Sequence, residues 1–158
     1  MNFNTEEIAM DLRFKVHIKI QKPVSEVFDA VHNPKKLSSY FTTGGASGPL
    51  DEGKTVTWDF ADFPGAFPVY VKQVIPNQLI VFEWQAAGSE KDSYNTKVEM
   101  RFESLEDNST MVSITESGWK QDDKGLESSY GNCSGWSHMS CCLKAFVEYG
   151  INLRKGSF

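Results

Sequence analysis

The chain has 158 residues and a formal net charge of −5, with 16 Lys and Arg residues against 21 Asp and Glu residues. This length fits one domain with a sizeable core, and the acidic balance disfavours a general binding surface for nucleic acid. No stretch approaches the roughly 18 uninterrupted apolar residues of a membrane span, and the N-terminus lacks the apolar region of an export signal. We therefore expect a cytoplasmic protein of one domain that binds neither nucleic acid nor a membrane.

Three cysteines, Cys133, Cys141 and Cys142, all fall in the last quarter of the chain. An odd number of cysteines suits a reducing compartment, and we interpret them as free thiols that pack as small helix residues. Neither the cysteines nor the three histidines have the spacing of metal ligands. The sequence therefore predicts no metal site and no cofactor.

The first elements are a strand and two short helices. From Arg13 to Ile20 apolar and polar residues alternate, which predicts a strand with one buried and one solvent-facing side. Pro23 suits the first turn of a helix, while Asn33 and Pro34 are the residue types preferred at the N-cap and first position of a second helix.

The middle of the chain predicts an antiparallel meander. Short alternating segments follow one another, separated by turn signals and without a helical crossover. The side chains expected on the buried face are Phe14, Val16, Trp58, Phe82, Val98, Met100, Phe102 and Ile114. Those expected on the solvent face are His17, Lys19, Thr57, Asp59 and Glu99.

The last predicted element is a long helix from about Leu126 to Leu153, where the helical period returns without a proline. Gly131 and Gly135 weaken its first turns by about 1 kcal/mol each relative to Ala. One apolar face of a sheet and one apolar face of a helix must cover each other. The sequence thus predicts an α+β domain.

Four segments carry a resemblance to a known superfamily. They are Pro-Val-Ser-Glu-Val-Phe-Asp-Ala-Val at 23–31, Asn-Pro-Lys-Lys-Leu at 33–37, Leu-Ile-Val-Phe-Glu-Trp at 79–84 and Gly-Trp at 135–136. Together with the predicted order of elements, which is strand, two helices, strands and long helix, these segments resemble the START-like, or SRPBCC, superfamily. Within it, the chain is most similar to homologues of the activator of heat-shock protein 90 ATPase.

This resemblance implies a helix-grip fold, in which a curved antiparallel sheet and two short helices wrap around the long C-terminal helix. We expect the domain to cover residues 11–155, after a poorly ordered N-terminal extension at residues 1–10. The superfamily also implies a pocket between the sheet and the C-terminal helix, where many members bind apolar ligands. The candidate ligand-binding residues are Trp58, Phe60, Phe82, Trp84, Met100, Trp136, Met139, Ser140, Leu143 and Val147.

Two departures from the subfamily favour a ligand that carries a polar group. A Leu is common where Ser140 stands, and a Trp is common near Tyr40, so hydroxyl groups replace apolar side chains. Because Ser140 shares the apolar stripe of the helix with Trp136 and Leu143, we expect its hydroxyl to orient the ligand. That expectation fails if the hydroxyl bonds back to the carbonyl four residues earlier.

One motif imitates a nucleotide site. Residues from Gly48 to Thr55 match the phosphate-loop pattern of Gly, four residues and Gly-Lys-Thr. However, Pro49 removes an amide that should bind phosphate, Asp51 and Glu52 repel it, and the segment continues into a predicted strand. We therefore predict no nucleotide binding.

Several titratable groups are candidates for acid–base chemistry. Four glutamates lie in alternating strand segments, where most are expected to face solvent: Glu83, Glu99, Glu103 and Glu116. The placement of Glu116 is the least certain of the four. His138 lies beside the apolar stripe of the long helix and is expected at the surface. No catalytic triad, metal cluster or cofactor fingerprint is visible, so we expect no enzymatic activity.

Three functions remain open. The leading hypothesis is noncatalytic binding of a small apolar or amphipathic molecule in a cavity under the long helix. The second is a co-chaperone-type protein that binds a heat-shock protein 90 chaperone, which the subfamily resemblance implies. The third is a helix-grip enzyme of the cyclase or hydrolase type.

Overall fold

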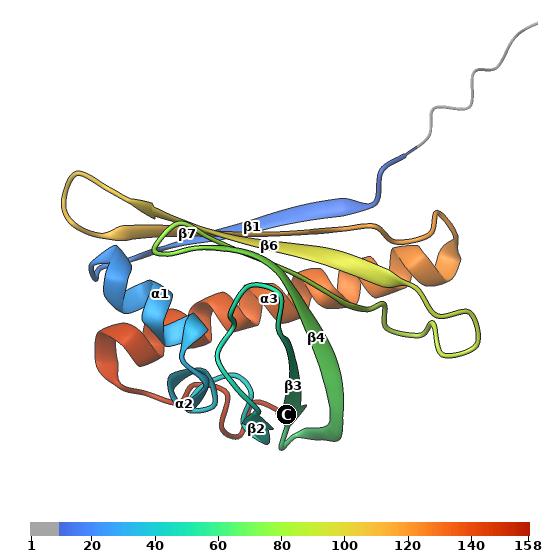
Figure 1. The fold of residues 1–158 in the computed structure, drawn as a ribbon, viewed down its shortest axis with the longest axis horizontal. Helices are drawn as coiled ribbons and strands as arrows, with labels where there is room; N and C mark the ends of the chain where they lie inside the picture. The colour runs from blue at the N-terminus through green and yellow to red at the C-terminus, as the bar shows by residue number, and fades with distance from the viewer. Residues whose placement is uncertain (1–9) are drawn as a thin grey trace, which may run out of the picture.

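The computed structural model describes residues 10–158 and shows one sheet covered on one side by helices (Figure 1). The elements are β1 (Arg13–Ile20), α1 (Val24–His32), α2 (Pro34–Leu37), β2 (Gly45–Ala46), β3 (Thr55–Phe60), β4 (Phe63–Ile75), β5 (Leu79–Gln85), β6 (Asn95–Ser104), β7 (Thr110–Ser117) and α3 (Asp123–Tyr149). The predicted N-terminal extension lies almost wholly outside the described residues.

The sheet has seven strands in the order β1-β7-β6-β5-β4-β3-β2, and every neighbouring pair is antiparallel. Strands β2 to β7 form the predicted meander, while β1 adds to the free edge of β7. Helix α3 lies across one face of the sheet, and β3 and β4 curve toward the same side (Figure 1). This arrangement confirms the predicted α+β, helix-grip fold.

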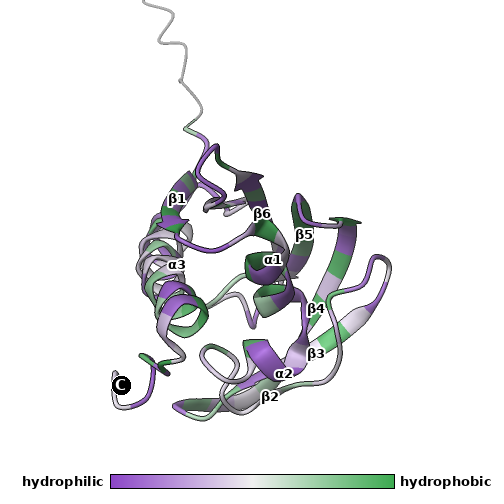
Figure 2. Ribbon diagram, turned by 90° about the vertical axis from the view of Figure 1, so that its left-hand side faces the viewer, coloured by the Kyte–Doolittle hydropathy of each residue, from purple (hydrophilic) through white to green (hydrophobic). Residues whose placement is uncertain are grey.

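The alternation of polar and apolar residues sets which side of each strand is buried. Figure 2 shows hydrophilic and hydrophobic residues as alternating bands along the strands. Six of the eight predicted core residues are at most 4% exposed. The other two, Phe14 and Val16, are half-buried because β1 is an edge strand with a neighbour on one side only. On the opposite face His17, Lys19 and Thr57 are exposed. The buried side chains form one core with α1 and α3.

Helix ends follow the capping residues. The Asn33 side chain accepts hydrogen bonds from the backbone N–H groups of Lys35 and Lys36 at 3.0 and 3.4 Å, which confirms it as the N-cap of α2. Helix α3 begins and ends about three or four residues earlier than expected. Asp122 caps its N-terminus, and Gly150 terminates it with a left-handed φ of 69°.

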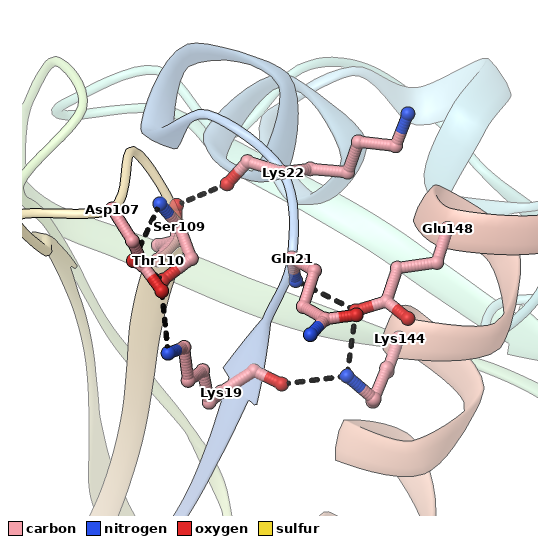
Figure 3. Close-up of polar contacts among 8 residues, drawn as sticks. All are labelled: Lys19, Gln21, Lys22, Asp107, Ser109, Thr110, Lys144 and Glu148. Atoms are coloured by element: carbon pink, nitrogen blue, oxygen red, sulfur yellow. Dashed lines mark hydrogen bonds and ion pairs between the residues drawn. The ribbon is translucent and has the colours of Figure 1, made fainter.

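A polar cluster joins the end of β1 to the last turns of α3 (Figure 3). The Lys144 ammonium donates to the backbone carbonyl of Lys19 at 2.8 Å and to the Glu148 carboxylate at 2.6 Å. That carboxylate also accepts from the backbone N–H of Gln21 at 2.6 Å. On the other side of β1, Lys19 pairs with Asp107 in the β6–β7 turn at 2.7 Å. The cluster therefore fixes the first strand to the last helix.

Among residues 10–158, no helix is long and apolar enough to cross a membrane. The phosphate-loop match ends at Thr55, the first residue of β3, so a strand and not a helix comes directly after it. Cys133, Cys141 and Cys142 are free, as expected, and only Cys142 is fully buried.

Replacing Gly125 by Ala tests the packing at the start of α3. A Cβ at this position would lie 1.9 Å from the backbone carbonyl oxygen of Lys120, far inside van der Waals contact. We expect Gly125→Ala to lower the free energy of unfolding by about 1–3 kcal/mol, measured by urea denaturation. The matched control is Gly131→Ala in the same helix, where a Cβ meets nothing within 4 Å. Equal stability of Gly125→Ala and the wild type would contradict this packing.

Candidate functional site

A pocket of about 160 Å³ lies where α3 passes the curved end of the sheet. An engineered apolar cavity of about 150 Å³ in another protein holds one benzene molecule, so this pocket has the size of a single aromatic ring. The lining residues are Phe41, Phe60, Trp84, Gly131, Asn132, Gly135, Trp136 and Arg154. They come from the segment after α2, from β3 and β5, from α3 and from the C-terminal segment. The pocket therefore depends on the whole fold.

Aromatic rings form most of its walls. The indoles of Trp84 and Trp136 have centroids 5.4 Å apart, and the Phe41 ring lies 5.6 Å from Trp136 and 5.0 Å from Phe60. Such tilted and edge-to-face pairs stabilise one another beyond their buried area. The walls are thus rigid and apolar.

A buried carboxylate lies directly behind these walls. Glu116 is 0% exposed, and both of its oxygens accept hydrogen bonds. Its donors are the Trp84 indole N–H at 2.7 Å, the Thr96 hydroxyl at 2.9 Å, the Asn132 amide at 3.0 Å and the Trp136 indole N–H at 3.1 Å. Three of the four donors line the pocket, so Glu116 fixes the orientation of the pocket wall.

No cation is among these partners of Glu116. Burial removes the carboxylate from water and is the main cause that raises the pKa of Glu116, while the four hydrogen bonds act in the opposite direction. A buried charge is costly unless it is hydrogen-bonded, and here neutral donors replace water. The site therefore keeps a titratable group close to an apolar pocket.

Three of the four strand glutamates are at least partly exposed, as expected of most of them, and Glu116, the least certain of the four, is the exception. Glu103 is exposed, while Glu83 and Glu99 are partly exposed. In β7, by contrast, Glu116 follows Val112 and Ile114 at intervals of two, and all three are buried. The period of two was therefore the signal that places this carboxylate in the core.

The predicted ligand-binding residues fall into two groups. Phe60, Trp84 and Trp136 line the pocket. Of the remaining seven, six lie in the hydrophobic core, with Val147 partly buried at its edge, and Ser140 is a buried polar residue. The seven are Trp58, Phe82, Met100, Met139, Ser140, Leu143 and Val147. Contact between a ligand and any of the ten stays a prediction.

The hydroxyl of Ser140 is already engaged. It donates to the backbone carbonyl of Trp136 at 2.9 Å, the alternative that removes it as the orienting group for a ligand. The sequence reasoning missed Asn132, which brings a polar amide to the pocket. His138 is partly exposed, near Cys142 and Phe158, and does not line the pocket.

Two further observations bear on chemistry. Within the described residues, no group of three or more His, Cys, Asp or Glu side chains is arranged to hold a metal ion. In the same part of the chain, the indole nitrogen of Trp58 is the one fully buried side-chain polar atom without a hydrogen-bond partner. Its ring packs against Phe41 and Trp84, both of which line the pocket.

Replacing Glu116 by Gln tests the buried carboxylate. The Gln amide places an N–H₂ group among the hydrogen-bond donors that surround position 116, so at least one of these donors loses its acceptor. We therefore expect Glu116→Gln to lower the free energy of unfolding by about 1–3 kcal/mol. Because the folded pKa of Glu116 is raised above 4.5, its contribution to stability is greatest below pH 4.5 and falls as the pH rises toward the folded pKa.

Urea denaturation of both proteins across this pH range checks the prediction, since the difference between wild type and Glu116→Gln isolates this one group. The difference should shrink as the pH rises. A difference that grows with pH would contradict a raised pKa.

Comparison with known proteins places this chain in a family. A family model described as "Activator of Hsp90 ATPase homolog 1-like protein" matches residues 21–148. No curated protein matches the chain.

Solved structures share the fold. The protein SSP2350 from Staphylococcus saprophyticus is 28% identical, with 92% of this chain and 96% of that chain covered and a TM-score of 0.73. The Aha1 dimer from Colwellia psychrerythraea is 23% identical, covering 87% and 97%, with a TM-score of 0.70. DynU16, from the dynemicin biosynthetic locus, is 23% identical, covering 90% of this chain and 49% of its own, with a TM-score of 0.75. The chain thus belongs to the family of Activator of Hsp90 ATPase homolog 1-like proteins, as its resemblance implied.

Proposed function

We propose that this protein binds a small apolar or amphipathic molecule in the pocket between the sheet and α3, without catalysing a reaction. The observation that carries this proposal is the pair of glycines at the mouth of the pocket, Gly131 and Gly135.

Neither glycine is required by the fold. A Cβ at either position would meet nothing within 4 Å, and neither residue has a positive φ. Each glycine inside a helix costs about 1 kcal/mol relative to Ala. The two are four residues apart, so they share one face of α3. The helix therefore gives up stability at the two positions where side chains would narrow the pocket, a pattern typical of functional sites.

The lining indicates the chemical class of the ligand. The aromatic walls favour a flat apolar body, and the volume limits that body to about one ring. Both hydrogen bonds of the Asn132 side chain are donated by its Nδ2. Among the described residues its Oδ1 makes none, so it is left to accept from an O–H or N–H group of the ligand.

Binding without catalysis agrees with the state of Glu116. It is the titratable group directly behind the wall, yet its two oxygens are already occupied by four donors, and two indoles separate it from the pocket. A general base needs its oxygen within hydrogen-bond reach of the reacting proton. We therefore assign Glu116 a positioning role.

The second candidate function is binding to an Hsp90-type chaperone. The family description and the likeness to the Colwellia Aha1 dimer favour it. The two functions differ in where contact occurs, because a protein partner needs an interface of roughly 800 Å² on each side, far more than the rim of this pocket. Calorimetry with a bacterial-type Hsp90, using wild type and a variant with a filled pocket, distinguishes them. Chaperone binding that survives filling of the pocket would support the second function.

Replacing Gly135 by Leu tests the ligand-binding proposal. The added side chain fills the mouth of the pocket, so we expect at least a tenfold loss of affinity for phenol, a one-ring probe with an O–H donor. The affinity is measured from the shifts of the Trp84 and Trp136 indole N–H signals in ¹H–¹⁵N spectra during titration. The fold should be retained, because Leu is a better helix former than Gly.

The matched control is Ser134→Leu, one residue earlier in α3 at an exposed position outside the pocket lining. It should bind phenol as the wild type does. Phenol that leaves the two indole signals of the wild type unmoved, or binds Gly135→Leu equally well, would remove the proposal. Native mass spectrometry of protein purified without denaturation can then identify the natural ligand.

A further inference from the structure

The C-terminal tail, residues 151–158, returns to the pocket after α3 ends. Gly150 turns the chain with its left-handed backbone, and the tail then faces the β3–β4 turn, where Arg154 contacts Asp62. Four residues after Gly150, Arg154 reaches the pocket and lines it. The tail is therefore part of the pocket wall.

The Arg154 guanidinium occupies a site built from a carboxylate and aromatic rings. Its Nη2 lies 2.9 Å and 3.0 Å from the two carboxylate oxygens of Asp62, and its Nε lies 3.3 Å from Oδ1. Its central carbon lies 4.7 Å from the ring centroid of Phe60, 5.7 Å from that of Phe41 and 5.0 Å from that of Phe158, which belongs to the tail itself. The side chains of Arg154 and Asp62 are only 13% and 19% exposed, although the Asp62 backbone is open to solvent. A bidentate ion pair and three ring faces, two of them outside the tail, thus hold one cation.

Apart from Arg154, the tail contacts the rest of the protein through one ring pair, Phe158 with His138 of α3, whose centroids lie 5.3 Å apart. Ile151, Leu153 and Phe158 are 52%, 44% and 77% exposed. Beyond the helix cap, the hydrogen bonds from the tail to the rest of the described chain are those between Arg154 and Asp62. A hollow of about 300 Å³ lies between the tail and the β3–β4 turn. The tail is therefore attached chiefly through the side chains of Arg154 and Phe158, neither of which belongs to the core, and it can leave without disturbing the core.

If Arg154 left, its site would remain on the body of the protein. Asp62 stands in the β3–β4 turn, Phe60 at the end of β3 and Phe41 after α2. A partly buried carboxylate without its partner is unfavourable, and the ring faces next to it attract positive charge. The empty site would consequently favour another cation, and two of its three members, Phe41 and Phe60, also line the pocket.

We propose that the mouth of the pocket is a binding site for an organic cation, a guanidinium or alkylammonium group attached to the ring-sized body of the ligand, and that Arg154 is its tethered competitor. This inference rests on the proposed function and adds the charge of the ligand. Because the tether is only four residues long, Arg154 competes at an effective concentration in the millimolar range. A free ligand therefore displaces it only if its body also gains the aromatic contacts of the pocket.

An anionic ligand that pairs with Arg154 is the main alternative. The structure disfavours it because Asp62 already pairs with the guanidinium in a bidentate geometry. An anion would have to displace the Asp62 carboxylate or lie beside it, where it is repelled, whereas a cation that replaces Arg154 takes over the same ion pair.

The experiment compares three one-ring probes of similar shape but different charge. Phenylguanidinium is the cation, phenylurea its neutral counterpart and benzoate the anion. Their affinities are measured by NMR titration for the wild type, for Arg154→Ala and for the control Lys155→Ala. The control removes the same charge from the neighbouring residue, whose side chain is exposed. The ratio of phenylguanidinium to phenylurea affinity should rise about tenfold or more in Arg154→Ala and stay unchanged in Lys155→Ala. Adding Asp62→Asn to Arg154→Ala should abolish that gain.

An unchanged ratio in Arg154→Ala would overturn the inference, as would benzoate binding that is lost with Arg154. In either case phenylurea binding that is lost in Gly135→Leu would still support the proposed pocket, so the two failures are distinguishable. Should Arg154→Ala be too unstable for titration, thermal unfolding gives the same answer. Phenylguanidinium at millimolar concentration should then raise its melting temperature more than phenylurea does, and an equal rise would overturn the inference.

Discussion

The hydrogen bonds to the buried carboxylate of Glu116 are the interaction on which the site depends. One side chain of β7 there holds the indoles of β5 and α3 in fixed orientations, together with the Asn132 amide. If the carboxylate were absent, its four donors would lose their acceptor, and the two indoles could rotate into the pocket. The satisfied hydrogen-bond network thus keeps the pocket wall ordered.

The cost of this arrangement is visible elsewhere in the fold. Helix α3 carries two glycines that packing does not require, and the Trp58 indole lies buried without an acceptor. These features weaken the fold at one end of the helix. At the other end, the ion pair of Lys144 with Glu148 and the bond to β1 strengthen it. The protein thus combines a tightly joined end with an end whose stability is reduced in favour of open space.

Local patterns predicted most of the fold, while the site depended on contacts between distant segments. Alternation located the buried face of the sheet, and Asn33 identified a helix start, because both effects act over a few residues. The same alternation places Glu116 inside, but an apolar reading of the core gives no reason to expect a carboxylate there. Its four donors come from β5, β6 and α3, and their meeting follows from the register of the sheet together with the packing of α3 on it. The return of Arg154 is likewise set by the turn at Gly150, which a continuous helical period obscured.

The pairing of β1 with β7 determines when the chain can complete its fold. The first strand has its neighbour about a hundred residues later, and Gln21 bonds to Glu148 across 127 positions. During synthesis β1 leaves the ribosome long before its neighbour in the sheet or its contacts on the helix exist. The sheet consequently stays open at that edge until β7 has been made. Such distant pairings slow folding and expose unpaired strands to other chains, so the nascent protein passes through a stage at which it is most prone to aggregation.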